Sequence, residues 1–167
     1  MRLPLSGALL AALAAGQELP INGIAHAAFF VSDIEKARAF YTGLLGYEEA
    51  FSLKDAQGNL RYAFFKINED QYLELFPGLK PQQDRRMSHL ALATPDIEKL
   101  HKLLTERGLA PGKIQQGRDG NLNFSVKDPD GMRVEFVEYR PGSGVRQARG
   151  KLLGPDRVPD RRRHVCI

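Results

Sequence analysis

One pattern of apolar and polar residues occurs twice along the chain. Residues 26–36 read HAAFFVSDIEK, and residues 89–99 read HLALATPDIEK. In both copies a histidine lies seven positions before the aspartate of an Asp-Ile-Glu-Lys tetrapeptide. The copies lie 63 residues apart, so the unit is larger than a solenoid repeat and smaller than an ordinary domain. The pattern therefore predicts two similar halves within one domain.

Each copy predicts a buried strand that is followed by a helix. In the first copy an apolar run leads to Ser32 and Asp33, either of which can cap a helix over residues 33–44 that ends at Gly46. In the second copy the helix begins at residues 94–96 and ends at Gly108. The residues of the first helix that we expect to be buried, from their helical spacing, are Ile34, Ala37, Phe40, Tyr41 and Leu44.

Three strand-like segments follow each predicted helix. They cover residues 48–53, 60–67 and 72–76 in the first half, and 113–116, 122–127 and 132–139 in the second half. Both halves therefore read βαβββ. We predict an α+β domain over residues 22–140, with units at about 22–80 and 86–140, whose strands form a curved mixed sheet around one cavity.

The two ends of the chain have a different composition. Residues 1–16 are a short apolar run with one arginine before it and small residues at its end, as in a secretory signal peptide. We expect a periplasmic or secreted protein that has no membrane association in its mature form. The alternative is an N-terminal helix packed on the domain, in a cytoplasmic protein. Residues 141–163 are basic and rich in Gly and Pro, which predicts a linker.

The last four residues, 164–167, begin with a histidine followed by small and apolar residues, as both earlier halves do. One hypothesis is that they start a further unit and that the chain is a truncated form of a longer protein. The alternative is a frayed basic tail.

Charge and cysteine content exclude some classes of function. The net charge is only +4, and no aromatic residues interleave the C-terminal arginines to stack on bases, so a nucleic-acid partner is not expected. Cys166 is the only cysteine, which excludes an intrachain disulfide and a thiolate metal cluster.

Two histidines and two glutamates occupy matching places in the two halves. His26 and His89 lie on the first strand of each half, and Glu74 and Glu135 lie between apolar neighbours on the last strand. Alternation puts each glutamate on the strand face opposite its apolar neighbours, where a carboxylate must be solvated, paired or bound to a metal. Two imidazoles and two carboxylates suit Zn²⁺, Ni²⁺, Co²⁺, Mn²⁺ or Fe²⁺. The alternative for these residues is two exposed glutamates and two packed histidines.

Paired βαβββ units with this register resemble the vicinal-oxygen-chelate superfamily, which includes glyoxalase I, methylmalonyl-CoA epimerase, extradiol dioxygenases and bleomycin-binding proteins. The resemblance covers about residues 22–140, and includes Phe40-Tyr41, Leu45-Gly46 and the Asp128-Pro-Asp-Gly131 turn before Glu135. It implies one divalent metal ion held by His26, Glu74, His89 and Glu135.

The His, Glu, His, Glu set is most similar to that of metal-dependent glyoxalase I. The resemblance implies a lyase, isomerase or dioxygenase that acts on a small substrate with neighbouring oxygens, with Glu135 as the base and Glu74 on the opposite face. Bacterial glyoxalase I has an arginine where this chain has Phe30, which favours a substrate other than a glutathione adduct. Aromatic residues that could line the cavity are Phe29 or Phe30, together with Phe64 and Phe124; the alternative role for each of them is core packing. A non-catalytic small-molecule-binding protein is the competing class, and a homodimer is consistent with the family.

Overall fold

The computed structural model describes residues 17–150. The predictions for residues 1–16 and 164–167 lie outside the described residues. Within the described part, no helix is long and apolar enough to cross a membrane.

The first half of the domain begins with a strand and a helix, and three strands follow. Its elements are β1 (Gly23–Val31), α2 (Ile34–Arg38), η1 (Ala39–Leu44), β2 (Glu48–Lys54), β3 (Leu60–Lys66) and β4 (Tyr72–Pro77). The Asp33 side chain caps α2 by accepting hydrogen bonds from the backbone N–H groups of Glu35 and Lys36. The second half has the same order, with β5 (Met87–Ala93), α3 (Ile97–Glu106), β6 (Gln115–Gln116), β7 (Leu122–Lys127) and β8 (Arg133–Glu138). The predicted βαβββ order is therefore confirmed for both halves.

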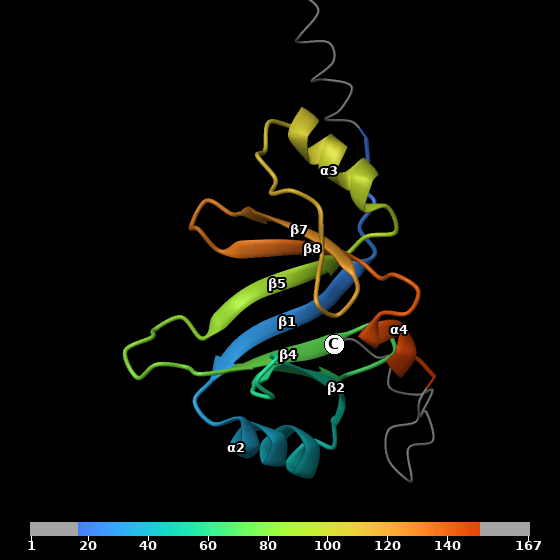
Figure 1. The fold of residues 1–167 in the computed structure, drawn as a ribbon. Coiled ribbons are helices and arrows are strands. Elements are labelled where there is room, and N and C mark those ends of the chain that lie inside the picture. The colour runs from blue at the N-terminus through green and yellow to red at the C-terminus, as the bar shows by residue number, and fades with distance from the viewer. Residues whose placement is uncertain (1–16, 151–167) are drawn as a thin grey trace, which may run out of the picture.

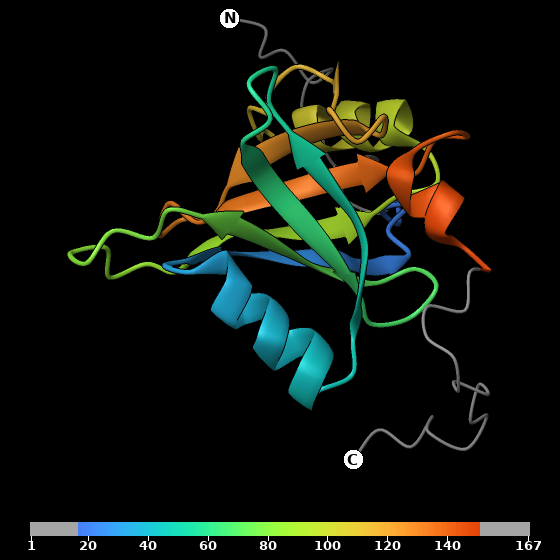
Figure 2. The ribbon, with the colours of Figure 1, turned by 60° about the horizontal axis from the view of Figure 1, so that its bottom comes forward.

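All the strands of the described residues form one mixed sheet in the order β2-β3-β4-β1-β5-β8-β7-β6. The halves join where β1 pairs antiparallel with β5, while β1 pairs parallel with β4 and β5 pairs parallel with β8. The sheet is strongly curved, with α2 and α3 at opposite ends of its outer surface (Figures 1 and 2). The predicted α+β fold with a curved mixed sheet is confirmed.

Each helix covers its own apolar core on the outer surface of the sheet. Under α3, the buried side chains of Ile97, Leu100 and Leu104 pack against Phe124 and Phe136. Under α2, the core is built on Ala63, Phe65 and Leu75, and Phe29 packs against it. Because these residues point outward toward the helices, the alternate residues of the same strands face the concave side.

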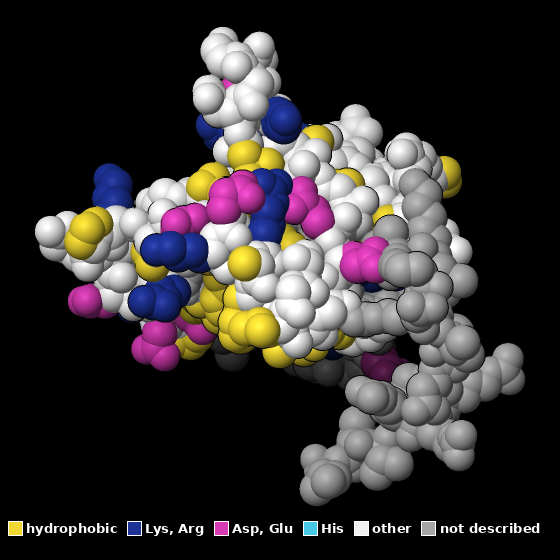
Figure 3. Space-filling model, turned by 90° about the horizontal axis from the view of Figure 1, so that it is seen from below, with side chains coloured by type: hydrophobic (Ala, Val, Ile, Leu, Met, Phe, Trp, Pro, Cys, Tyr) yellow, Lys and Arg dark blue, Asp and Glu magenta, His cyan; other side chains and the backbone are white. Residues whose placement is uncertain are grey.

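The first predicted helix covers the expected residues but is less regular and less buried than its sequence indicates. An α-helix over Ile34–Arg38 changes into the π-helical turn η1 over Ala39–Leu44, which shifts the later side chains around the axis. Phe40 is 47% exposed and Leu44 is 78% exposed, so the prediction that both are buried is wrong. Hydrophobic side chains are accordingly visible among charged ones on the side of the molecule that carries α2 (Figure 3).

A short helix that was not predicted, α4 (Gly144–Ala148), follows the second half. Ser143 caps it, and the side chains of Val145 and Ala148 are buried. Val145 packs against Phe64 and Tyr72, and the Lys66 ammonium group donates a hydrogen bond of 2.9 Å to the carbonyl of Ala148. The linker prediction is therefore wrong for residues 144–148, because α4 packs on the domain beside β2 (Figure 1).

Candidate metal centre

The structure brings the side chains of all four predicted ligand residues together at the middle of the sheet. His26 lies on β1 and His89 on β5, the two strands that join the halves. Glu74 lies on β4 and Glu135 on β8, the strands that flank this central pair. The carboxylates therefore approach the two imidazoles from opposite sides.

Strand register places the four residues symmetrically. Ala28 pairs with Glu74 on one side and with His89 on the other, and Ala91 pairs with Glu135 and with His26 in the same way. Both alanines are fully buried. A methyl group at these positions leaves room for the longer side chains on either side to meet above it.

The ligand atoms lie close to one another. The Nε2 atoms of His26 and His89 are 3.0 Å apart. The Glu135 Oε2 atom lies 3.4 Å from the first and 3.3 Å from the second, and the Glu74 Oε2 atom lies 3.5 Å and 3.3 Å from them. His26, His89 and Glu135 each offer an atom within 4.8 Å of the other two.

The separations among the ligand atoms of His26, His89 and Glu135 suit a single divalent ion. Metal–ligand bonds of about 2.0–2.2 Å place neighbouring ligand atoms roughly 2.8–3.6 Å apart, for angles between a right angle and the tetrahedral angle. In addition, the buried Oε2 atom of Glu74 has no hydrogen-bond partner among the described residues. A buried carboxylate oxygen without a partner is costly, and a cation between it and the imidazoles would satisfy it. The residues present therefore fit such an ion.

Two effects determine the pKa values in the cluster: the burial of its side chains, and the proximity of the imidazoles to the carboxylates. Burial raises the pKa of Glu135, but the imidazoles of His26 and His89 outweigh burial and hold that pKa far below its usual range. Burial lowers the pKa of His89, but the adjacent carboxylates of Glu135 and Glu74 outweigh burial, so the pKa of His89 is raised. Glu135 is therefore ionised at neutral pH, as a ligand or a base must be.

Aromatic rings border the cluster on the concave face of the first half. The ring of Phe64 meets that of His26 edge-on at 5.5 Å and stacks on Phe51 at 4.6 Å. The ring of Phe76 lies 6.3 Å from that of His89 and 5.5 Å from that of Phe30. Phe30 thus lies on the same strand face as His26, and Phe64, only 2% exposed, packs against His26 within the core.

The other two aromatic residues suggested for the cavity wall lie elsewhere. Phe124 is in the core beneath α3, and Phe29 packs in the core beneath α2. Both have the outward orientation that strand alternation gives to every second residue. The suggestion that Phe124 lines the cavity is therefore wrong, and of the two alternatives Phe29 and Phe30, Phe29 is the one that packs in the core.

Arg133 is a residue at the centre that sequence reasoning did not single out. It lies on β8 two positions before Glu135, and its Nη2 atom is 2.5 Å from the Nδ1 atom of His89. Its shared strand face with Glu135 was the signal that could have identified it.

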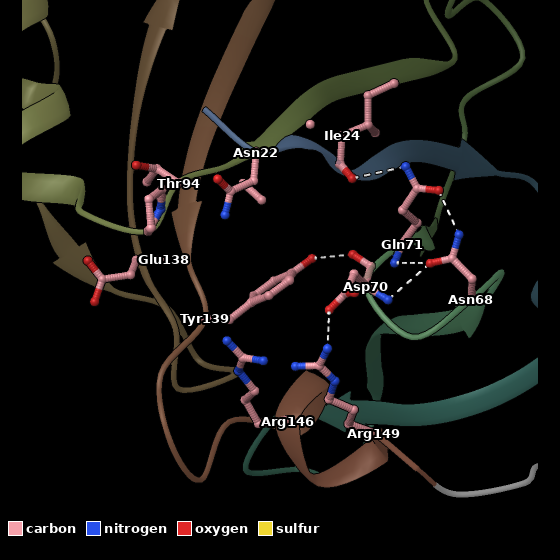
Figure 4. Close-up of a pocket in the computed structure, with 13 residues that line it drawn as sticks. Asn22, Ile24, Asn68, Asp70, Gln71, Thr94, Glu138, Tyr139, Arg146 and Arg149 are labelled. Carbon is pink, nitrogen blue, oxygen red and sulfur yellow. Dashed lines mark hydrogen bonds and ion pairs between the residues drawn. The ribbon is translucent and has the colours of Figure 1, made fainter. Parts of the chain in front are cut away.

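A cavity of about 630 Å³ lies away from the centre, at the start of β1, between the end of β8 and α4 (Figure 4). Its polar groups largely satisfy one another: the Tyr139 hydroxyl donates to the Asp70 carbonyl at 3.0 Å, and Arg149 lies 3.5 Å from the Asp70 carboxylate. Burial also raises the pKa of Tyr139, which keeps its hydroxyl protonated. None of the four predicted ligand residues lines this cavity.

The structure resembles solved structures at low sequence identity. Methylmalonyl-CoA epimerase from Mycobacterium tuberculosis matches with a TM-score of 0.64 and 17% identity, over 75% of this chain and 93% of that one. A methylmalonyl-CoA epimerase in complex with methylmalonyl-CoA and NH4+ matches with a TM-score of 0.61 and 18% identity, over 74% of this chain and 98% of that one.

A hypothetical protein, BH1468 from Bacillus halodurans C-125, matches with a TM-score of 0.59 and 19% identity, over 72% of this chain and 96% of that one. At these identities the likeness shows the fold. No curated protein was found to be similar in sequence.

The sequence itself matches a family model over residues 23–136, which begins with β1 and ends within β8. This range includes all four candidate ligands and both βαβββ halves. The chain belongs to the glyoxalase/bleomycin resistance protein/dioxygenase superfamily.

Proposed function

We propose that this protein is a metal-dependent enzyme whose small substrate chelates the ion through two neighbouring oxygen atoms. One observation carries the proposal: four ligand atoms from His26, Glu74, His89 and Glu135 converge on the concave face of the sheet. A divalent ion bound there would polarise a carbonyl group and stabilise negative charge on its oxygen.

The two carboxylates are the groups that can move a proton. Glu135 is the base in this proposal, because its carboxylate is ionised and its side chain, at 12% exposed, is the more accessible of the two. Glu74, whose side chain is 7% exposed, lies on the other side of the imidazoles. Carboxylates on opposite sides of a bound substrate could remove a proton from one face and return it to the other, as an isomerase requires.

The aromatic border gives the site a preference for small substrates with an apolar part. Phe76 lies against His89 and is only partly buried, so an apolar group of the substrate would replace water against its ring, whereas the buried ring of Phe64 holds His26 from behind. The name of the structurally similar epimerases supports proton transfer of this kind.

A dioxygenase is the second candidate, because His26, His89 and Glu135 form a set of two histidines and one carboxylate. That set, with open positions, is typical of non-haem iron oxygenases. The close approach of Glu74 to both Nε2 atoms, at 3.5 Å and 3.3 Å, favours the four-ligand centre and thus the isomerase or lyase.

Two assays on metal-reconstituted protein distinguish these functions. A panel of 2-hydroxy ketones is incubated in D2O, and deuterium incorporation at the carbon next to the carbonyl is followed by NMR. A panel of catechols is tested for oxygen uptake with the iron-loaded protein. We expect deuterium incorporation that falls at least about 100-fold in Glu135→Gln, since general-base catalysis contributes about that much or more.

The matched control is Glu106→Gln, which makes the same change at an exposed position of α3 and should retain full exchange activity. Oxygen uptake without deuterium exchange would replace the isomerase with the dioxygenase. Absence of both activities in protein that holds one ion per chain would contradict the proposal.

A further inference from the structure

Arg133 is a cation on the same strand face as Glu135, and it borders the candidate metal centre. Its side chain is 42% exposed, so it is reachable from solvent. The Nη1 atom lies 3.8 Å from Glu135 Oε1, which is too long for a hydrogen bond, and the Nη2 atom lies 2.5 Å from His89 Nδ1. The guanidinium group therefore makes no bidentate salt bridge with a carboxylate among these contacts.

The contact between Arg133 and His89 conflicts with metal ligation by His89. Arginine carries only hydrogen-bond donors, so His89 Nδ1 must accept in this contact. An imidazole that ligates a metal through Nε2 ordinarily carries its proton on Nδ1 and donates it to a neighbouring acceptor. Two donors would then face each other. The Ser88 hydroxyl, 3.1 Å from the same Nδ1 atom, can accept that proton instead.

An ion bound to Nε2 of His89 would therefore release the Arg133 guanidinium group from Nδ1. The positive charge of the ion acts in the same direction, because it repels a guanidinium group held against one of its own ligands. The freed group remains beside the Glu135 carboxylate at the edge of the site. A planar fork of donors in this place is suited to a carboxylate or a phosphate.

We propose that Arg133 binds an anionic group of the substrate, next to the two oxygens that chelate the ion. This inference rests on the proposed function and specifies its substrate class: an acid with neighbouring oxygens, such as a 2-oxo or 2-hydroxy acid, rather than a neutral diol. Arg133 is a specificity-determining residue in this account, and the ion is held by the other four side chains.

The test compares two small chelators on nickel-loaded protein by isothermal titration calorimetry. Oxalate chelates through two oxygens and carries further anionic oxygens, whereas acetohydroxamate chelates through two oxygens and carries no further anion. In Arg133→Gln we expect oxalate to bind at least roughly tenfold more weakly, which is the usual effect of losing a charge-assisted pair. Acetohydroxamate should bind within about twofold of wild type, since its chelating atoms do not need the arginine.

Two further variants separate recognition from general charge. Arg133→Lys keeps the positive charge but loses the planar pair of donors that can bind a carboxylate in a bidentate way. Its oxalate affinity should therefore lie between those of the wild type and Arg133→Gln. Arg61→Gln removes a positive charge from an exposed position on β3 and should leave both affinities unchanged. Equal oxalate affinity in wild type and Arg133→Gln would overturn the inference.

Metal affinity, measured in the same variants, distinguishes the inference from a structural role. If Arg133 mainly held His89 in place, Arg133→Gln would bind nickel more weakly, and that result would also overturn the inference. We expect equal or tighter nickel binding, because a competitor for His89 Nδ1 has been removed. Wild-type protein that binds no ion would instead contradict the proposed function itself.

Discussion

The Nε2 atoms of His26 and His89 lie 3.0 Å apart, although 63 residues separate the two histidines in the chain. Antiparallel pairing of β1 with β5 brings the two histidines together. Each half of the domain contributes one histidine and one glutamate to the candidate metal centre. The candidate metal centre therefore exists only when the two halves pair.

The small residues beside the ligands give a first prediction. Ala28 and Ala91 are fully buried and pair with ligand residues on both sides. Ala91→Leu should lower the free energy of unfolding by about 1–3 kcal/mol, as overpacking does, and weaken metal binding because Glu135 and His26 are pushed apart. Ala91→Ser, which adds only one oxygen atom at the same position, is the matched control for Ala91→Leu. Thermal unfolding and metal titration check this, and unaltered metal affinity in Ala91→Leu would contradict the geometry.

Metal affinity should depend on pH through His89. Because the carboxylates of Glu135 and Glu74 raise its pKa, His89 takes up a proton at a higher pH than an ordinary histidine does. That proton would end the contact of Nδ1 with Arg133, and a protonated imidazole cannot ligate. Glu135 has a lowered pKa and stays ionised throughout the neutral range, so it adds no dependence there. We expect nickel affinity to rise by roughly tenfold or more from about pH 6 to about pH 8. A flat profile would show that no histidine proton is displaced.

The metal-free protein should show the opposite trend at high pH. The raised pKa of His89 means that its contribution to stability is present below about pH 6.5 and is lost as the pH rises through the folded-state pKa. The lowered pKa of Glu135 means that its contribution is present above about pH 4.3 and is lost as the pH falls.

Thermal unfolding in the presence of a chelator should therefore give the highest Tm in mildly acidic solution, between those two values. His89→Gln should flatten the upper side of this profile. His101→Gln, a change on α3 away from the cluster, should leave it unaltered. A profile of the same shape in His89→Gln would assign the dependence to other groups.

Helix α4 gives a prediction about the concave face. A Cβ atom on Gly144 would lie 2.8 Å from the Phe51 ring, which is held by stacking on Phe64 at 4.6 Å. Gly144→Ala should therefore destabilise the protein by about 1–3 kcal/mol. Gln147→Ala changes an exposed residue of the same helix and should have an effect within about 0.5 kcal/mol. Denaturant unfolding of both variants measures the difference, and equal stabilities would mean that α4 does not pack as the structure has it.

The sequence predicted those features that strand alternation and the doubled motif determine. A buried glutamate between apolar neighbours has few structural roles, so Glu74 and Glu135 stood out, and the matching histidines identified the strands that meet. Alternation along each strand assigns Phe64 and Phe124 to one face or the other of their strands. Which of these faces becomes the concave one depends on how the two halves pair. The sequence pattern alone could not show this.

Other features depend on local geometry that helical periodicity does not describe. The π-helical turn at Ala39–Leu44 shifts Phe40 and Leu44 toward solvent, which a regular helix would not do. Helix α4 lies in a segment rich in Gly and Arg, where composition favours a linker. Its capping residue Ser143 and the buried pair Val145 and Ala148 were the only signals that it folds.

The central claim is that four side chains from both halves bind one divalent transition-metal ion. The most direct test is elemental analysis of purified protein after reconstitution and removal of loosely bound metal, with the wild type beside Glu135→Gln, Glu74→Gln and the control Glu106→Gln. The account predicts one ion per chain in the wild type and in the control, and a clear loss in the other two variants. Wild-type protein that retains no metal, or equal occupancy in all four proteins, would contradict it.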